Sequence, residues 1–192
     1  AAWLPCTEVE GPGRRAALWV QGCDKRCPGC CNQRMLPFVE REMLPAADIV
    51  QRLAEAQDAF GIEGVTFLGG EPMLQARGLA QVALGARALG LTVMVFTGYT
   101  LDELATVQPA DWQALLQASD VLVDGQYLAQ QPDTERRWIG SRNQRVHYLS
   151  ARYDASIERL PQKGRDMELR FGLDGALRVN GWPVRIVRPR DI

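Results

Sequence analysis

Histidine is almost absent from this sequence: His147 is the only one among 192 residues. A single imidazole excludes most zinc-hydrolase sites and most acid–base mechanisms that depend on histidine. We expect His147 to be a plain strand residue between Val146 and Tyr148. The chemistry of this protein must therefore come from other side chains or from a cofactor.

Strong net charge and long apolar runs are also missing. The formal net charge is −1, which argues against nucleic-acid binding through the overall field of the protein. No apolar run approaches the roughly 18 residues of a membrane span, and no signal peptide opens the sequence. With 46% apolar and 23% charged residues, we expect a cytoplasmic globular protein with no nucleic-acid or membrane partner.

Cysteine, in contrast, is concentrated in one place. Five cysteines occur, and four of them fall within nine residues, at positions 23, 27, 30 and 31. An odd number of crowded thiols makes a poor disulfide framework, because each bridge needs its own Cα spacing and side-chain directions. Clustered thiols of this kind favour a metal or redox site.

Strands and helices alternate along most of the chain. Short apolar runs predict strands at 16–21, 65–68, 91–96, 121–123 and 145–149, and helical periodicity predicts helices at 45–60, 74–89, from 101 onward, and at 111–118. Gly61 is expected to stop the first helix, and Thr100 with Glu103 forms a capping box for the third. The fold class is therefore α/β, with a parallel sheet that is either open or part of a (β/α) barrel.

In such folds ligands collect at the carboxyl ends of the strands. Those ends carry residues 22–23, 69–72, 97–99 and 124–125. The glycine-rich and polar residues of the chain are thus predicted to share one rim. Each of these segments, taken alone, also has a plainer interpretation as a turn.

The pattern changes after residue 150. Residues 167–171 and 177–187 read as short strands, with turn signals at 174–175 and 180–181. We therefore predict two domains: residues 1–150, a partial-barrel domain, and residues 151–192, a β-rich C-terminal extension with a small antiparallel addition.

Cys23, Cys27 and Cys30 stand at i, i+4 and i+7 in a loop with glycine and proline. Three such thiolates suit a 4Fe-4S cluster and would leave one iron without a protein ligand, as a catalytic cluster needs. A structural zinc, with Cys31 or His147 as fourth ligand, is an alternative. A ferredoxin-like electron carrier is another.

The Cys-x3-Cys-x2-Cys loop resembles the signature of the radical S-adenosylmethionine (SAM) superfamily. Residues 69–72, Gly-Gly-Glu-Pro, are similar to its glycine-rich methionine-binding motif. Residues 10–14 resemble the segment that precedes the cluster in glycyl-radical-enzyme activases. The resemblance is greatest to the anaerobic ribonucleotide reductase activating proteins, through residues 97–99, 120–125 and 140–145 and through the Cys-Pro-Gly-Cys end of the cysteine loop.

This resemblance implies a radical SAM oxidoreductase. Cys23, Cys27 and Cys30 would hold the 4Fe-4S cluster, and SAM would be bound through its unique iron. The remaining cofactor-binding residues would be Gly69, Gly70, Glu71, Pro72, Thr97, Tyr99, Asp124, Ser141 and Asn143. Reduction would split SAM into methionine and a 5′-deoxyadenosyl radical. The radical would then form a glycyl radical on a partner enzyme, under anaerobic conditions and with a flavodoxin- or ferredoxin-type electron donor.

Two other functions remain open at this point. One is a stand-alone radical SAM enzyme that acts on a small molecule or peptide. The other is a non-catalytic iron–sulfur or zinc module. Cys31 departs from the family pattern and is an accidental neighbour, a substitute ligand or a reactive thiol. The extension is a docking element, a lid or a stabilising hairpin.

Overall fold

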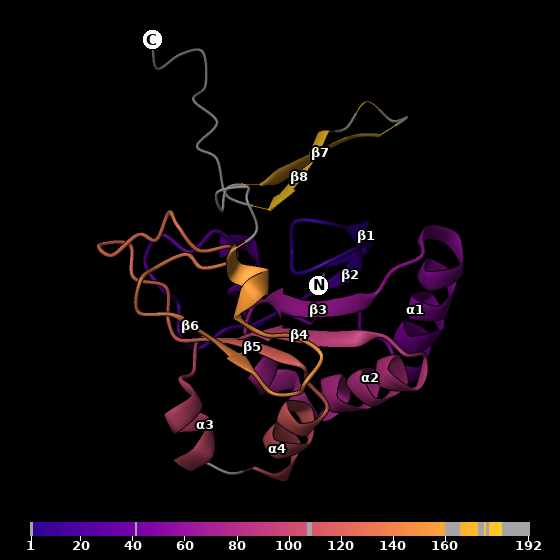
Figure 1. Ribbon diagram of the computed structural model, residues 1–192, viewed down its shortest axis with the longest axis horizontal. Coiled ribbons are helices and arrows are strands. Elements are labelled where there is room, and N and C mark those ends of the chain that lie inside the picture. The colour runs from indigo at the N-terminus through magenta and orange to yellow at the C-terminus, as the bar shows by residue number, and fades with distance from the viewer. Residues whose placement is uncertain are drawn as a thin grey trace.

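The computed structural model describes residues 2–40, 42–106, 109–159, 166–172, 175 and 177–181. A six-stranded sheet in the order β1-β2-β3-β4-β5-β6 forms its centre (Figure 1). These strands are β1 (Ala2–Thr7), β2 (Arg15–Val20), β3 (Gly64–Gly69), β4 (Thr92–Phe96), β5 (Val121–Asp124) and β6 (Arg145–Tyr148). Strands β2 to β5 are parallel to one another.

The two edges of the sheet differ from the all-parallel prediction. β1 was not predicted and pairs antiparallel with β2, and β6 pairs antiparallel with β5. A parallel return needs a crossover of a dozen or more residues, usually through a helix. Residues 125–144, between β5 and β6, contain no helix, so β6 returns antiparallel. His147 lies in β6, as expected.

The helices fall close to their predicted positions. They are α1 (Ala46–Phe60), α2 (Ala76–Ala88), α3 (Leu101–Thr106) and α4 (Ala110–Gln117), with short 3-10 turns η1 (Gln33–Met35), η2 (Pro72–Gln75) and η3 (Ala155–Arg159). Gly61 ends α1 in the left-handed conformation, with φ 62°. The capping box also forms, because Thr100 N–H donates to Glu103 Oε2 at 2.6 Å and Glu103 N–H donates to Thr100 Oγ1 at 3.2 Å. No described helix has both the length and the apolar character needed to cross a membrane.

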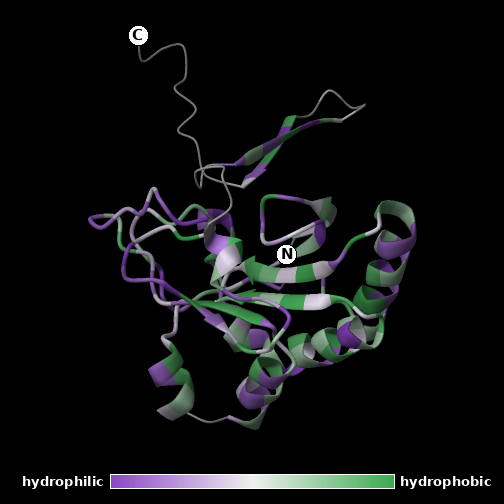
Figure 2. Ribbon diagram, viewed as in Figure 1, coloured by the Kyte–Doolittle hydropathy of each residue, from purple (hydrophilic) through white to green (hydrophobic). Residues whose placement is uncertain are grey.

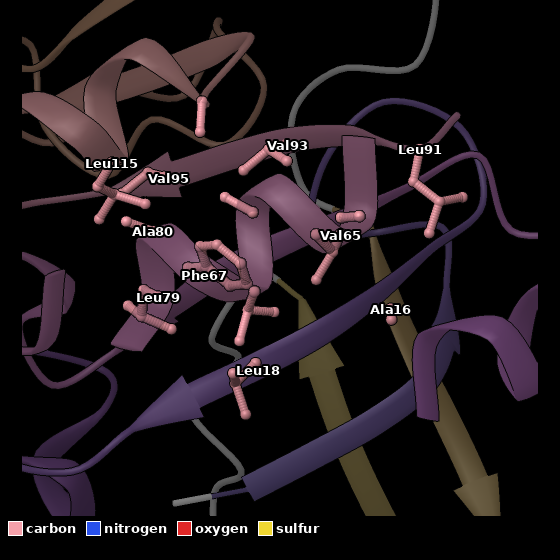
Figure 3. Close-up of a cluster of buried hydrophobic side chains, with 14 of the residues drawn as sticks. Ala16, Leu18, Val65, Phe67, Leu79, Ala80, Leu91, Val93, Val95 and Leu115 are labelled. Atoms are coloured by element: carbon pink, nitrogen blue, oxygen red, sulfur yellow. The ribbon is translucent and has the colours of Figure 1, made fainter. Parts of the chain in front are cut away.

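The main core lies between one face of the sheet and the helices. Ala16, Leu18, Val65 and Phe67 point from β2 and β3 toward the face of α2 that carries Leu79 and Ala80 (Figure 3). The central strands are largely apolar, whereas the helices carry both polar and apolar residues (Figure 2). Burying one large apolar side chain contributes roughly 1.5–3 kcal/mol, so this face stabilises the sheet.

The opposite face of the sheet is partly polar. Arg15 is fully buried there and donates hydrogen bonds to Thr66 Oγ1 at 2.7 Å and to the Val65 carbonyl at 3.0 Å. The loop before β2 crosses this face, since Thr66 Oγ1 donates to the Glu10 carbonyl at 2.8 Å. Gly11 has φ 152°, and a Cβ there would lie 2.7 Å from the Arg15 side chain.

A separate two-stranded antiparallel sheet follows the main one. It consists of β7 (Met167–Phe171) and β8 (Leu177–Gly181). Gly175, between the strands, has φ 75° and donates its N–H to Gly172. The predicted turn at Asn180-Gly181 is wrong, because both residues belong to β8. Asp174 and the predicted strand residues 182–187 lie outside the described residues.

Candidate functional site

A cavity of about 270 Å³ opens at the carboxyl ends of the parallel strands. The long loops gather at the end of the sheet toward which β3 points (Figure 1). The lining combines the cysteine loop (residues 22–32) with the ends of β3, β4 and β5, so the predicted rim is found. Among its members are Cys23, Cys27, Cys30, Cys31, Gly69, Gly70, Glu71, Thr97, Gly98 and Gly125.

Backbone hydrogen bonds fix the cysteine loop. Gly22 N–H donates to the Met35 carbonyl at 2.8 Å, and Cys23 N–H donates to the Leu36 carbonyl at 3.1 Å. A tight turn then follows, because Cys30 N–H donates to the Cys27 carbonyl at 3.1 Å. The loop thereby brings thiols that are four and three residues apart to the same cavity.

The thiols differ in their surroundings. Cys23 is buried, Cys27 and Cys30 are half-buried, Cys31 is exposed, and none of them forms a disulfide. Burial raises the pKa of Cys23 and of Cys27. A hydrogen bond with the Cys31 thiol lowers the pKa of Cys30 to about 6, which favours its thiolate, the form that binds metals.

The donor set fits an iron–sulfur cluster. The thiols of Cys23, Cys27 and Cys30 line one cavity and form no disulfide, and thiolates are the usual ligands of such clusters. Within the described residues, no three His, Cys, Asp or Glu side chains converge on a position for a single metal ion. A four-iron cluster does not require that convergence, because each thiolate binds a different iron.

The two glycines of the Gly-Gly-Glu-Pro turn are needed for packing inside the protein. A Cβ on Gly70 would lie 2.3 Å from the Gly22 carbonyl oxygen and 2.9 Å from that of Met35. Gly69 has φ 106°, and its Cβ would lie 2.7 Å from the backbone of Trp19. The turn therefore holds the cysteine loop by close backbone contact, in addition to lining the cavity.

Glu71 joins the ends of β3 and β4. Glu71 is only 1% exposed. Its carboxylate accepts hydrogen bonds from Met73 N–H at 2.9 Å, Thr97 Oγ1 at 2.8 Å and Gly98 N–H at 2.8 Å. Burial raises the pKa of Glu71. The first hydrogen bond caps η2, which begins at Pro72, and the other two fix the turn after β4.

Five of the predicted cofactor-binding residues do not line the cavity: Pro72, Tyr99, Asp124, Ser141 and Asn143. Pro72 is buried at the start of η2. Asp124 accepts from Leu101 N–H at 2.7 Å and from Arg145 N–H at 3.2 Å, and it lies 2.9 Å from His147 Nε2. It therefore fixes α3 and β6 to the end of β5.

Ser141 and Asn143 lie outside the cavity lining and hydrogen-bond to the loop after β5. Ser141 Oγ accepts from Leu128 N–H at 3.0 Å, and Asn143 Nδ2 donates to the Gln126 carbonyl at 2.7 Å. Gln126 lies beside the cysteine loop, where its Oε1 is 3.9 Å from Cys27 Sγ. Neighbouring Gln144, which does line the cavity, donates to the Gly125 carbonyl at 3.0 Å.

Several lining residues are absent from the predicted site list. Besides Cys31, Gly98, Gly125 and Gln144, they are Val9, Glu10, Trp19, Lys25, Gly29, Asn32, Leu36, Leu68, Phe96, Tyr127, Arg137, Trp138, Gly140, Asp166 and Gly181. Strand alternation gives a signal for two of them, because Trp19 and Phe96 point away from the helix-covered face. Trp138 has φ 61°, an unfavourable conformation for a bulky residue that often marks a functional site.

Comparisons with known proteins agree with this site. A family described as 4Fe-4S single cluster domain matches residues 9–147. An anaerobic ribonucleoside-triphosphate reductase-activating protein of Vibrio cholerae is 35% identical over 150 residues, which cover 76% of this chain and 94% of the relative. The protein of the same name from Escherichia coli K12 is 31% identical over 153 residues, 77% and 96% of the two chains. Its counterpart in Enterobacteria phage T4 is 31% identical over 147 residues, 74% and 88%.

The family model supports an iron–sulfur cluster, and its range contains every residue of the cavity lining except Asp166 and Gly181. Together with the thiols and with Gly69, Gly70 and Glu71, which line this cavity, the family model and the relatives confirm the resemblance seen in the sequence. The chain belongs to the family of the anaerobic ribonucleoside-triphosphate reductase-activating proteins.

Proposed function

We propose that this protein activates an anaerobic ribonucleoside-triphosphate reductase by forming a glycyl radical on it, as a radical SAM oxidoreductase. The observation that carries the proposal is that the thiols of Cys23, Cys27 and Cys30 line the same cavity as residues 69–71 of the Gly-Gly-Glu-Pro turn. The names of the relatives supply the class of partner. A flavodoxin- or ferredoxin-type protein is the proposed electron donor.

Cys23, Cys27 and Cys30 are the proposed ligands of a 4Fe-4S cluster. When bound, the cluster would supply the electron that splits SAM into methionine and a 5′-deoxyadenosyl radical, which takes a hydrogen atom from a glycine Cα of the reductase. The protein's own task is to orient the reactants and to exclude water. Few acid–base groups are needed for this task.

The proposed SAM site divides into lining and supporting residues. Gly69, Gly70, Glu71 and Thr97 line the cavity and are the residues proposed to contact SAM. The carboxylate of Glu71 is occupied by three internal donors, so it contributes mainly by fixing the backbone around it. The supporting residues lie outside the lining and are proposed to hold it in place; they are Pro72, Tyr99, Asp124, Ser141 and Asn143.

The open sheet supports a partial-barrel arrangement for residues 1–150. Its parallel strands β2 to β5 present the cavity at their carboxyl ends, while β1 and β6 leave the two edges of the main sheet unjoined. An incomplete barrel admits a polypeptide loop, whereas a closed one would exclude it. Residues 151–192 are proposed as a separate extension.

Anaerobic reconstitution tests the proposal directly. The loaded protein, reduced with dithionite and given SAM, should release 5′-deoxyadenosine. With the reductase of the same organism present, an electron paramagnetic resonance doublet from a glycyl radical should appear. A loaded cluster without 5′-deoxyadenosine contradicts the enzyme assignment. 5′-Deoxyadenosine without the doublet contradicts the activase assignment and favours a small-molecule substrate.

A further inference from the structure

The β7–β8 hairpin exposes its apolar face to solvent, whereas an ordinary amphipathic ribbon packs that face against the protein. Cross-strand pairing places Leu169 opposite Val179 and Phe171 opposite Leu177, so these four side chains share one face. That face is turned to solvent: Leu169 is 52% exposed, Phe171 80%, Leu177 51% and Val179 42%. Polar and apolar residues alternate along both strands (Figure 2).

The polar face of the hairpin is directed toward the body of the protein. Glu168 Oε1 accepts from Glu8 N–H at 2.9 Å, and Asn180 Nδ2 donates to Thr7 Oγ1 at 2.9 Å. Arg170 donates to the Cys6 carbonyl of β1. A two-stranded ribbon is marginally stable by itself. These polar contacts therefore hold it against the end of β1 and the loop that follows.

The base of the hairpin forms part of the cavity wall. Asp166 and Gly181 both line the cavity. Gly181 N–H donates to Glu10 Oε1 at 2.8 Å, and Asp166 Oδ2 accepts from Arg137 Nη2 at 2.8 Å. The apolar ribbon thus begins at the site where the chemistry is proposed and extends away from it.

The hairpin lies outside the part of the chain that matches the family, which ends at residue 147. The matched range contains the cysteine loop and strands β2 to β5 but not the hairpin. Exposed contiguous apolar surface of this kind commonly marks a protein contact. A polypeptide that inserts a glycine into the cavity meets a wall that includes Asp166 and Gly181, the two residues at the base of the hairpin.

We infer that the apolar face of β7–β8, defined by Leu169, Phe171, Leu177 and Val179, is a docking surface for the reductase segment that flanks the radical-bearing glycine. This inference rests on the proposed function and adds a contact that the family domain lacks. Its chemistry is apolar, so the matching reductase surface should be apolar as well. Binding there would align the incoming loop with the cavity.

The double variant Leu169→Ser/Phe171→Ser tests this inference, with Leu84→Ser as matched control. Leu84 is 60% exposed on α2 and is absent from the cavity lining. The measurements are reductase-free 5′-deoxyadenosine formation and the reductase concentration that gives half-maximal glycyl radical. We expect the double variant to form 5′-deoxyadenosine at the wild-type rate. The reductase concentration for half-maximal glycyl radical should rise about tenfold, as loss of a central apolar contact causes. The control should change neither.

Hydrogen exchange supplies a readout that does not depend on radical formation. Adding the same reductase to the wild-type protein should slow exchange in residues 167–171 at least about fivefold, and the double variant should lose this protection. Unchanged radical formation and unchanged exchange overturn the docking surface even if the proposed function holds. A wild-type dimer that becomes monomeric in the double variant, with activation intact, assigns the face to a second copy and also overturns the inference.

Discussion

The hydroxyl of Tyr99, just after β4, donates a 2.6 Å hydrogen bond to Asp24 Oδ2 in the cysteine loop. The ring of Tyr99 also lies beneath Lys25 of that loop, with Nζ 3.6 Å from the ring centroid, and it packs against Trp112 of α4 at 4.8 Å. Burial and the Asp24 contact both raise the pKa of Tyr99. Tyr99 therefore anchors the cysteine loop to the helix layer from outside the cavity.

Tyr99→Phe should loosen the cysteine loop without removing the ring. A single hydrogen bond contributes about 1 kcal/mol, so we expect iron to be lost to a chelator about fivefold faster. Tyr148→Phe is the matched control, because Tyr148 donates an equally short bond, 2.6 Å, to Glu158 outside the cavity lining. Equal iron-release rates for the two variants would contradict the anchoring role.

The ligand assignment predicts a sharp division among the cysteines. Alanine at Cys23, Cys27 or Cys30 should each reduce bound iron from about four per chain to background and abolish 5′-deoxyadenosine formation. Cys31→Ala and Cys6→Ala should retain the cluster. Iron analysis and visible absorbance check this expectation, and loss of iron in Cys31→Ala but not in Cys30→Ala would reverse the assignment.

Gly70→Ala should separate the cysteine loop from β3. Its Cβ would meet the Gly22 carbonyl oxygen at 2.3 Å, and forced overpacking costs about 1–3 kcal/mol. We expect a lower free energy of unfolding in urea and poor cluster loading. Gly78→Ala in α2 is the control: its Cβ meets nothing within 4 Å, and alanine should stabilise the helix by about 0.5–1 kcal/mol. A Gly70→Ala chain that loads normally would show that the loop can shift.

Asp133 should make stability depend on pH. Burial alone raises the pKa of Asp133, but hydrogen bonds from Arg136 and Glu135 outweigh it and leave the pKa below its ordinary value. Arg136 in turn donates to the Gln144 carbonyl at 3.0 Å and so supports the cavity wall. Because the folded-state pKa lies below the unfolded value of about 3.9, the ionised carboxylate stabilises the fold above that pH. This contribution is lost as the pH falls through the folded-state pKa.

Asp133→Asn should therefore lower the free energy of unfolding by about 1–2 kcal/mol at neutral pH. The difference from wild type should begin to shrink as the pH falls below about 3.9 and should vanish once the pH is below the folded-state pKa. Urea titrations of the reduced, metal-free chain measure both values. Asp58→Asn, at an exposed position on α1, should stay within about 0.5 kcal/mol of wild type throughout. A difference for Asp133→Asn that is constant with pH would exclude the carboxylate charge as its cause.

Local sequence signals determined much of the scaffold. The parallel strands, the four helices, the stop at Gly61 and the capping box of Thr100 and Glu103 all follow from patterns within a few residues. The cysteine spacing and the Gly-Gly-Glu-Pro turn likewise indicated the site from the sequence. Such features depend on neighbouring residues, which the sequence contains directly.

Only the tertiary structure decided the roles that depend on distant partners. It placed Tyr99 and Asp124 behind the cavity as anchors, and it brought Glu10, Trp138 and Asp166 into the cavity lining. It also set the antiparallel edges of the sheet and turned the apolar face of β7–β8 outward. Each of these outcomes depends on contacts between segments far apart in the chain, whose relative energies no local pattern records.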